Sequence, residues 1–374
     1  MTLPARYNEL IDRCWEALQE GPDGVDVALV HKGPVSDLFD GLSDLDFRIV
    51  LGTRDTETWR WADDVFYRVF KEFAYAFPDS WRLVEHAPGR GLAIDELYSQ
   101  TSLGEFLEWE LLRESKPNTL PAAPALDETM RHMYLEKFYT YRDPYDATRD
   151  PAINVAPDHI DRFPLFSICW HFYVPALRCA AMASGIDGMQ SKWEALRWRA
   201  EAGSDVAARV LAAAENDFAG PAADLAERCS QDVQSLACEL TGSDDPWTAI
   251  GARIDSSRMP EQERLILVVL AGRMATGRWR FYTEAPEGYD LSAVLRIDRG
   301  HLKNYLLGPI LHDDGPEKLL AHAPDAEAHQ RGVDFVVNQM SATDLSQPRE
   351  VFQQLMEHYA VVREAIEGWY GEAG

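Results

Sequence analysis

The chain has 374 residues, 46% of them hydrophobic and 26% charged, so it is long enough for two domains and too apolar to be disordered. Its net charge of −26 disfavours nucleic acid as a partner, because phosphate backbones are bound by basic surfaces. No stretch is apolar enough to span a bilayer and no secretory signal is present, so we expect a cytoplasmic protein with no membrane partner. The sequence predicts no particular oligomeric state.

The first hundred residues alternate between helical and strand-like hydrophobic patterns. In chain order they predict a helix at 6–20, strands at 25–33 and 45–52, a long amphipathic helix at 56–77, and two strands within 81–99 joined by a PGRG turn. A further helix is predicted at 102–115. This order is typical of a compact α+β unit.

The pattern changes after residue 115. A proline-rich connection, KPNTLPAAPALD, is followed by strong helical patterns at 126–141, 163–184 and 190–217. We therefore predict an α+β protein with a mixed-sheet domain at residues 1–115 and a mostly α-helical domain at 116–374. The five cysteines are scattered and form no CxxC pair, which predicts buried free thiols rather than a zinc site.

The segment HKGPVSDLFDGLSDLDFRIVLG, residues 31–52, has two aspartates at the start of a predicted core strand. Because residues i and i+2 of a strand lie on one face, Asp44 and Asp46 can share a site while Leu45 packs on the opposite side. Paired carboxylates are suited to Mg²⁺, and a glycine-containing loop before them can hold phosphate oxygens with its backbone N–H groups. The competing interpretation is a solvated loop that leads into a strand.

Gly33 followed by SDLDFRIV resembles the signature of the polymerase-β-like nucleotidyltransferase superfamily. Two later segments, GEFLEWELLRE and CWHFYVPALRCAAMASGIDGMQSKWEALRW, are similar to parts of the streptomycin/spectinomycin adenylyltransferases. The likeness covers roughly residues 25 to 200. It implies a nucleotidyltransferase-type sheet domain followed by a helical domain.

The resemblance also implies residue roles. Asp44 and Asp46 would hold Mg²⁺, and a third carboxylate on a neighbouring strand would complete the site as metal ligand or general base. For that third position we favour Asp95, with Glu96 and Glu85 as alternatives. The resemblance assigns the remaining site residues to the phosphate loop, the triphosphate and the acceptor: Gly33, Ser36 and Ser43 in the loop, Lys192 and Arg178 at the triphosphate, and Trp109 in the acceptor pocket.

One position departs from the family pattern. Pro34 replaces the serine that follows the glycine, and proline has neither a hydroxyl nor an N–H to offer a phosphate. Ser36 or Ser43 could compensate. The departure leaves open a catalytically impaired nucleotide-binding protein of the same fold.

The sequence thus predicts an enzyme that moves NMP, with ATP the expected donor, onto a hydroxyl of a small molecule. An aminoglycoside, as in antibiotic resistance, and an intermediate of antibiotic or other specialised biosynthesis both fit. The third carboxylate would deprotonate the acceptor hydroxyl, which then attacks the α-phosphorus in line and displaces pyrophosphate. A nucleic-acid nucleotidyltransferase is the remaining alternative, and the acidic charge argues against it.

Overall fold

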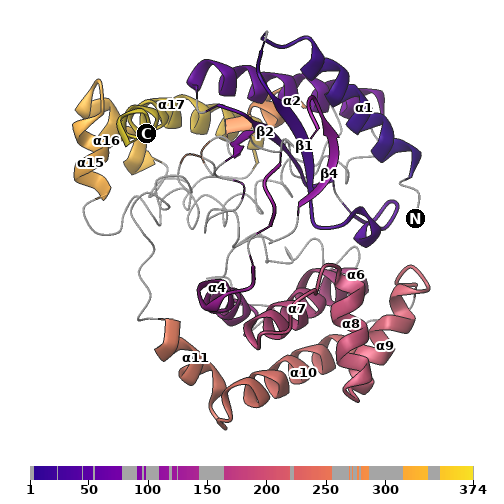
Figure 1. The fold of residues 1–374 in the computed structure, drawn as a ribbon. Helices are drawn as coiled ribbons and strands as arrows, with labels where there is room; N and C mark the ends of the chain where they lie inside the picture. Colours follow the sequence, from indigo (N-terminus) through magenta and orange to yellow (C-terminus); the bar gives the residue numbers. More distant parts are fainter. Residues whose placement is uncertain are drawn as a thin grey trace.

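The structure is a computed structural model of the chain. It describes residues 4–22, 24–43, 45–53, 55–77, 91–94, 97, 109–117, 120–123, 125–142, 164–219, 223–254, 269, 272, 276–277, 279–285, 315–335 and 346–373. These residues form two groups, a sheet with covering helices and a bundle of helices, as Figure 1 shows.

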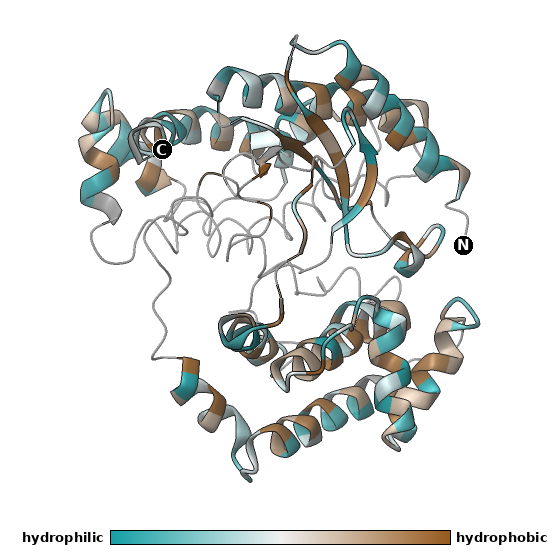
Figure 2. Ribbon diagram, in the orientation of Figure 1, coloured by the Kyte–Doolittle hydropathy of each residue, from teal (hydrophilic) through white to brown (hydrophobic). Residues whose placement is uncertain are grey.

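A four-stranded mixed sheet is the centre of the first group. Its strand order is β3-β2-β1-β4, formed by β1 (Val27–Lys32), β2 (Phe47–Leu51), β3 (Gly91–Ala93) and β4 (Trp109–Glu114). β1 pairs antiparallel with both β2 and β4, whereas β3 runs parallel to β2. β1 and β2 consist almost entirely of buried residues, and Figure 2 shows their hydrophobic character. Buried apolar strands of this kind need cover on both faces.

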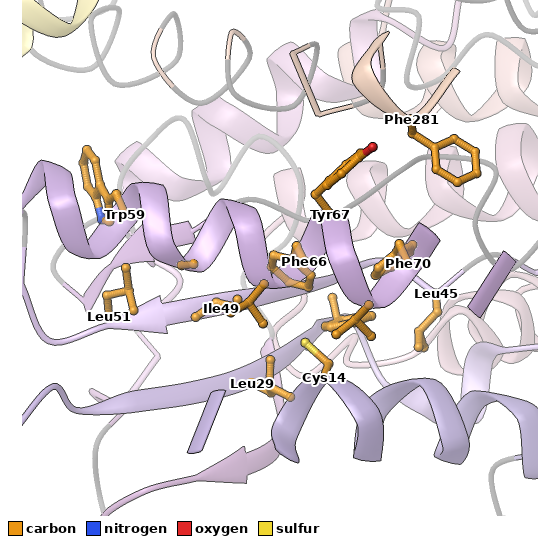
Figure 3. Close-up of a cluster of buried hydrophobic side chains, with 14 of the residues drawn as sticks. Cys14, Leu29, Leu45, Ile49, Leu51, Trp59, Phe66, Tyr67, Phe70 and Phe281 are labelled. Carbon is orange, nitrogen blue, oxygen red and sulfur yellow. The ribbon is translucent and has the colours of Figure 1, made fainter. Parts of the chain in front are cut away.

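Two N-terminal helices supply part of that cover. α1 (Ala5–Gln19) and α2 (Thr56–Ala76) pack against each other, and Asp55 caps α2 by accepting a hydrogen bond from the Thr58 N–H. Phe66 of α2 lies beside Ile49 of the sheet, as Figure 3 shows, and the Phe47 ring packs against Phe66 and Phe70 with centroids 5.0 and 5.5 Å apart. The predicted helices at 6–20 and 56–77 and strands at 25–33 and 45–52 are confirmed.

The C-terminal helices belong to the same core. α17 (Pro348–Ala373) packs against α15 (Gly315–Ala321) and α16 (Ala326–Asp334). Tyr370 of α17 contacts Trp59 of α2 with ring centroids 5.1 Å apart, and Glu367 accepts a hydrogen bond from Arg60. The C-terminal residues therefore share one hydrophobic core with the sheet.

The second group is entirely helical among the described residues. It contains α4 (Glu128–Tyr139), α6 (Pro164–Phe166), the π-helix η4 (Ser167–Tyr173), α7 (Val174–Ala183), α8 (Lys192–Glu201), α9 (Asp205–Ala214), α10 (Ala223–Thr241) and α11 (Pro246–Ile254). These helices enclose a second core that Phe39, from the first group, also enters. The helical patterns at 126–141 and 163–184 are confirmed, and the wider π turns directly before Pro175 were not expected.

One predicted element is wrong, and one predicted helical segment is divided. The helix expected at 102–115 is instead the strand β4 over its described part, because Trp109–Glu114 completes the hydrogen bonding of β1. The helical pattern at 190–217 is confirmed, as the two helices α8 and α9. Gly203, with φ +99°, ends the first, and the Ser204 side chain caps the second.

The two hydrophobic cores draw on different parts of the chain. Described residues between 269 and 370 contribute to the sheet core, whereas the helical core is built mainly from described residues between 130 and 250. The boundary itself stays a prediction. None of the helices that the structure describes is long and apolar enough to cross a membrane.

Candidate functional site

Asp46 lies directly before β2 at one end of the sheet. Its carbonyl accepts a hydrogen bond from the Lys32 N–H, and its carboxylate is 3.5 Å from the Lys32 ammonium and 3.9 Å from the Arg48 guanidinium. The side chain is 31% exposed, whereas the neighbouring Leu45 is buried in the sheet core. Asp46 is therefore a reachable carboxylate, with Leu45 packed inward as predicted. Asp44 lies outside the described residues.

The residues from Gly33 to Ser43, called the Gly33–Ser43 loop below, connect β1 to this aspartate. Gly33 has φ +78°, a left-handed conformation that side-chain-bearing residues rarely adopt. Its carbonyl is 2.7 Å from Nδ1 of His31, a buried histidine. Burial lowers the pKa of His31 to about 4, despite the hydrogen bond to Gly33, so the ring is neutral at pH 7.

The backbone N–H groups of the loop are largely occupied by the chain itself. Val35 donates to the Glu110 carboxylate at 2.6 Å, and Phe39 donates to Oγ of Ser43 at 3.0 Å. The Asp37 N–H donates to the Pro34 carbonyl. Proline itself has no backbone N–H to donate. Ser43 thus holds the loop together as a buried side chain, rather than presenting its hydroxyl to solvent.

The loop is bound to the helical group through its middle. Trp193 of α8 donates its indole N–H to the Ser36 carbonyl at 3.0 Å, and Trp170 of the π-helix donates to the Asp37 carbonyl at 2.9 Å. The Lys192 backbone N–H donates to Oδ2 of Asp37 at 2.8 Å. The Phe39 ring packs edge-on against Trp170, with centroids 4.9 Å apart. Loop and helices are thereby joined by both polar and aromatic contacts.

Asp37 is the functional candidate that sequence reasoning missed. It is buried, and its Oδ1 accepts no hydrogen bond from the residues that the structure describes. Burial raises its pKa to about 6, although the charges of Lys192 and Arg178 and the hydrogen bond from Lys192 favour the carboxylate. Its place in the loop, between a glycine and the aspartate pair, was the only signal in the sequence.

The two cations predicted at the triphosphate lie around this carboxylate. Lys192 is the first residue of α8, and its ammonium is 5.5 Å from the centre of the Trp170 ring. Arg178 is buried in α7 and donates from Nε to the Met189 carbonyl at 2.7 Å. The fold therefore brings Ser36, Lys192 and Arg178 together from distant parts of the sequence.

Trp109 lies in β4, paired with Lys32 and bridged to Gly33 at the start of the loop. It is buried, and its indole N–H donates to the Leu97 carbonyl at 2.9 Å. Its expected position in a helix is wrong, because the segment is a strand. Its role in an acceptor pocket stays a prediction.

The three candidates for the third carboxylate, Asp95, Glu96 and Glu85, lie outside the described residues. The described residues include no cluster of three potential metal ligands. As a carboxylate, Asp46 would supply one hard oxygen ligand of the kind that Mg²⁺ prefers, in competition with its ion pairs to Lys32 and Arg48. Asp44, next but one in the sequence, would supply the second.

Comparisons of the chain with models of known protein families, with curated protein sequences and with solved structures find no match.

Proposed function

We propose that the protein is a Mg²⁺-dependent nucleotidyltransferase that moves NMP, with ATP the expected donor, onto a hydroxyl of a small molecule. The observation that carries the proposal is the convergence at the Gly33–Ser43 loop. One end of the loop leads into the aspartate pair, and its middle is hydrogen-bonded to α8 at Lys192, 155 positions after Asp37. Carboxylates for metal and cations for phosphate are thus connected by one short segment.

Different residues would bind the metal ion and the triphosphate. Asp44 and Asp46 would hold Mg²⁺, which when bound offsets the charge on the phosphoryl oxygens. Lys192 at the start of α8, and Arg178 behind it, would attract the triphosphate, since a helix N-terminus and a cation both favour anions. Positioning of the acceptor hydroxyl against the α-phosphorus supplies much of the rate.

The third carboxylate stays a choice among three residues. Asp95 is the favoured general base, with Glu96 and Glu85 as alternatives, and all three lie outside the described residues. We expect Asp95→Asn to reduce transfer far more than Glu96→Gln or Glu85→Gln if Asp95 is the base, and the variant with the largest loss identifies the residue.

The acceptor is proposed from charge. The chain carries a net charge of −26, which attracts cationic acceptors and disfavours nucleic acids as acceptors. An amino sugar such as an aminoglycoside is therefore a suitable acceptor, and an amine-bearing biosynthetic intermediate fits equally.

A second candidate function is nucleotide binding without transfer. The Val35 N–H, the first amide after Pro34, is taken by Glu110, whose negative charge also faces the loop. A phosphate could use this amide only after displacing that carboxylate. This arrangement favours the alternative in which the fold holds Mg-nucleotide and performs no chemistry.

The deciding experiment is pyrophosphate release with each of the four NTPs, Mg²⁺ and a panel of amino sugars. Asp44→Asn and Asp46→Asn should reduce release by at least about a hundredfold, because transition-state charge stabilisation of this kind is worth several kcal/mol. Asp40→Asn is the matched control, since Asp40 is an exposed carboxylate of the same loop. Nucleotide binding with no release from any acceptor supports the binding protein, and no nucleotide binding at all contradicts both functions.

A further inference from the structure

We propose that Asp37 is a positioning residue of the nucleotide site, whose carboxylate fixes the first turn of α8, and with it Lys192, against the Gly33–Ser43 loop. The inference rests on the proposed function in taking a nucleotide triphosphate as the ligand. It adds a residue that would act through Lys192 without touching the nucleotide.

The first support is that α8 needs no cap from Asp37. Ser191 accepts a hydrogen bond from the Glu194 N–H at 3.1 Å, and the Glu194 carboxylate accepts from the Ser191 N–H at 2.9 Å. This reciprocal capping box already satisfies the helix end locally. The additional bond from the Lys192 N–H to Asp37 therefore serves to join two distant segments, not to start the helix.

The second support is that the Gly33–Ser43 loop is held by hydrogen bonds from the helical group and from α1. Around the Asp37 carboxylate, the indoles of Trp193 and Trp170 hold the carbonyls of residues 36 and 37. On the other side, Tyr7 of α1 donates its hydroxyl to the carbonyls of Phe39 at 3.0 Å and Ser43 at 2.7 Å. A rigid loop held in this way sets the distance between α8 and the end of β2 where Asp46 lies.

The third support is the environment of the carboxylate. Charged groups face Asp37 from two helices of the bundle: Lys192 and Glu194 from α8, and Arg178 from α7. Burial of a carboxylate is costly, yet one of its oxygens accepts no hydrogen bond from the described residues. The negative charge is not needed to fill the space, since an asparagine has the same shape.

The experiment is a double-mutant cycle between Asp37 and Lys192, read by the Kd of a non-hydrolysable Mg·ATP analogue measured by calorimetry. Asp37→Ala should raise the Kd about tenfold, because a bond to a charged acceptor is worth roughly one decade of affinity. Lys192→Ala should raise it at least as much. In the Lys192→Ala background, Asp37→Ala should have no further effect, because Asp37 acts through that residue.

Conservative and matched variants complete the design. Asp37→Asn keeps an oxygen that can accept the Lys192 N–H, so its Kd should stay within about threefold of the parent, with the loss of the charge-assisted part of the bond. Asp40→Ala, at the exposed carboxylate of the same loop, should leave the Kd unchanged. Full additivity in the cycle, or tighter binding by Asp37→Ala, overturns the inference.

A readout without nucleotide separates this inference from the proposed function. Amide hydrogen exchange of residues 191–201 should be faster in Asp37→Ala than in Asp40→Ala, since only the former loses the anchor of α8. Absence of nucleotide binding by the unmodified protein would overturn the proposed function alone. Equal exchange in the two variants would overturn the role of Asp37, whatever the nucleotide result.

Discussion

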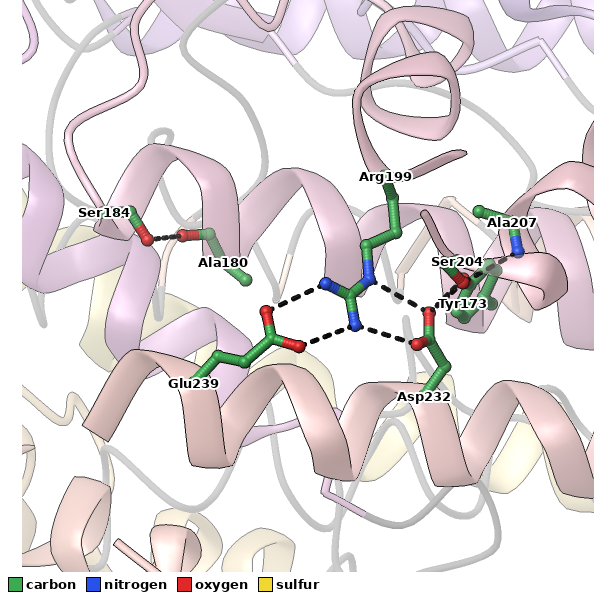
Figure 4. Close-up of polar contacts among 8 residues, drawn as sticks. All are labelled: Tyr173, Ala180, Ser184, Arg199, Ser204, Ala207, Asp232 and Glu239. Atoms are coloured by element: carbon green, nitrogen blue, oxygen red, sulfur yellow. Dashed lines mark hydrogen bonds and ion pairs between the residues drawn. The ribbon is translucent and has the colours of Figure 1, made fainter. Parts of the chain in front are cut away.

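Two aspartates, Asp37 in the loop and Asp232 in α10, are both largely buried beside cations, yet their surroundings shift their pKa values in opposite directions. Asp232 accepts hydrogen bonds from Arg199, Tyr173 and Ser204, as Figure 4 shows. Burial alone would raise its pKa, but these bonds outweigh it and leave the pKa below the ordinary value. Asp37 has one hydrogen bond to its carboxylate from the described residues, and burial prevails.

The difference distinguishes a buried carboxylate whose hydrogen bonds compensate for its burial from one whose burial is only partly compensated. Arg199 is bound by Asp232 and by Glu239, so α8 and α10 are locked together by a satisfied network. A network of this kind, with its polar groups satisfied, makes the packing of the two helices rigid. The Asp37 carboxylate joins the loop to α8 through one hydrogen bond, and its burial is only partly compensated, as is common for carboxylates at functional sites.

The largest effect should come from breaking the satisfied network. Asp232→Ala leaves the buried guanidinium of Arg199 with the exposed Glu239 as its remaining ion-pair partner. We expect a loss of about 3–5 kcal/mol in the free energy of unfolding, as for other broken buried pairs. Urea denaturation at pH 7 measures it, with Asp224→Ala on the exposed face of α10 as control. A loss below 1 kcal/mol would remove the contrast with Asp37.

Asp37→Asn should change the free energy of unfolding in the opposite direction, so that the variant is more stable than the unmodified protein. The raised pKa means that the folded protein binds a proton more tightly than the unfolded chain, so ionisation of Asp37 reduces stability as pH rises from about 4 through about 6. The variant should be more stable at pH 7 by about 1–3 kcal/mol, and the gain should vanish near pH 4. Denaturation of both proteins between pH 4 and 7.5 tests this. A gain independent of pH would contradict it.

Tyr173→Phe should cost less than the loss of Asp232. The variant removes one hydrogen bond to Asp232, which still accepts from Arg199 and Ser204. We expect a loss of about 1 kcal/mol, the usual value for a single bond. The same urea series measures it. Asp232→Ala with Tyr173→Phe should cost little more than Asp232→Ala alone, and additive losses would show that the network is not one unit.

Trp193→Phe should have the smallest effect on stability. It removes the indole N–H that binds the Ser36 carbonyl, in a half-buried position where water can replace it. We expect about 0.5–1 kcal/mol, together with faster amide exchange in the loop. Loop exchange equal to that of the unmodified protein would show that the Trp193 bond does not hold the loop.

Local patterns predicted much of this fold. The apolar periodicity of α1 and α2 and the buried run of β1 were sufficient to locate them, because those segments bury one consistent face. WELLRE was read as helix because its residues favour helices in isolation. Only pairing with β1, from 77 to 86 positions earlier, makes it a strand, and that contact has no local signal.

The candidate site was predictable in composition but not in contacts. The motif located Asp46 and the loop, and the resemblance named Lys192, but nothing in the sequence paired residue 37 with residue 192. Asp37 resembles any loop aspartate until its burial is known. Likewise the sharing of one core by α2 and α17 depends on contacts such as Trp59 with Tyr370, which no pattern along the chain reveals.

That shared core has a consequence for how the protein is made. During synthesis the sheet and α2 emerge early, but Trp59 and its neighbours remain without their partners until residues 348–370 have left the ribosome. The helical bundle, whose core lies mainly within residues 130–250, can complete its packing before then. We therefore expect the middle of the chain to fold first and the first residues made to be among the last to reach their final packing.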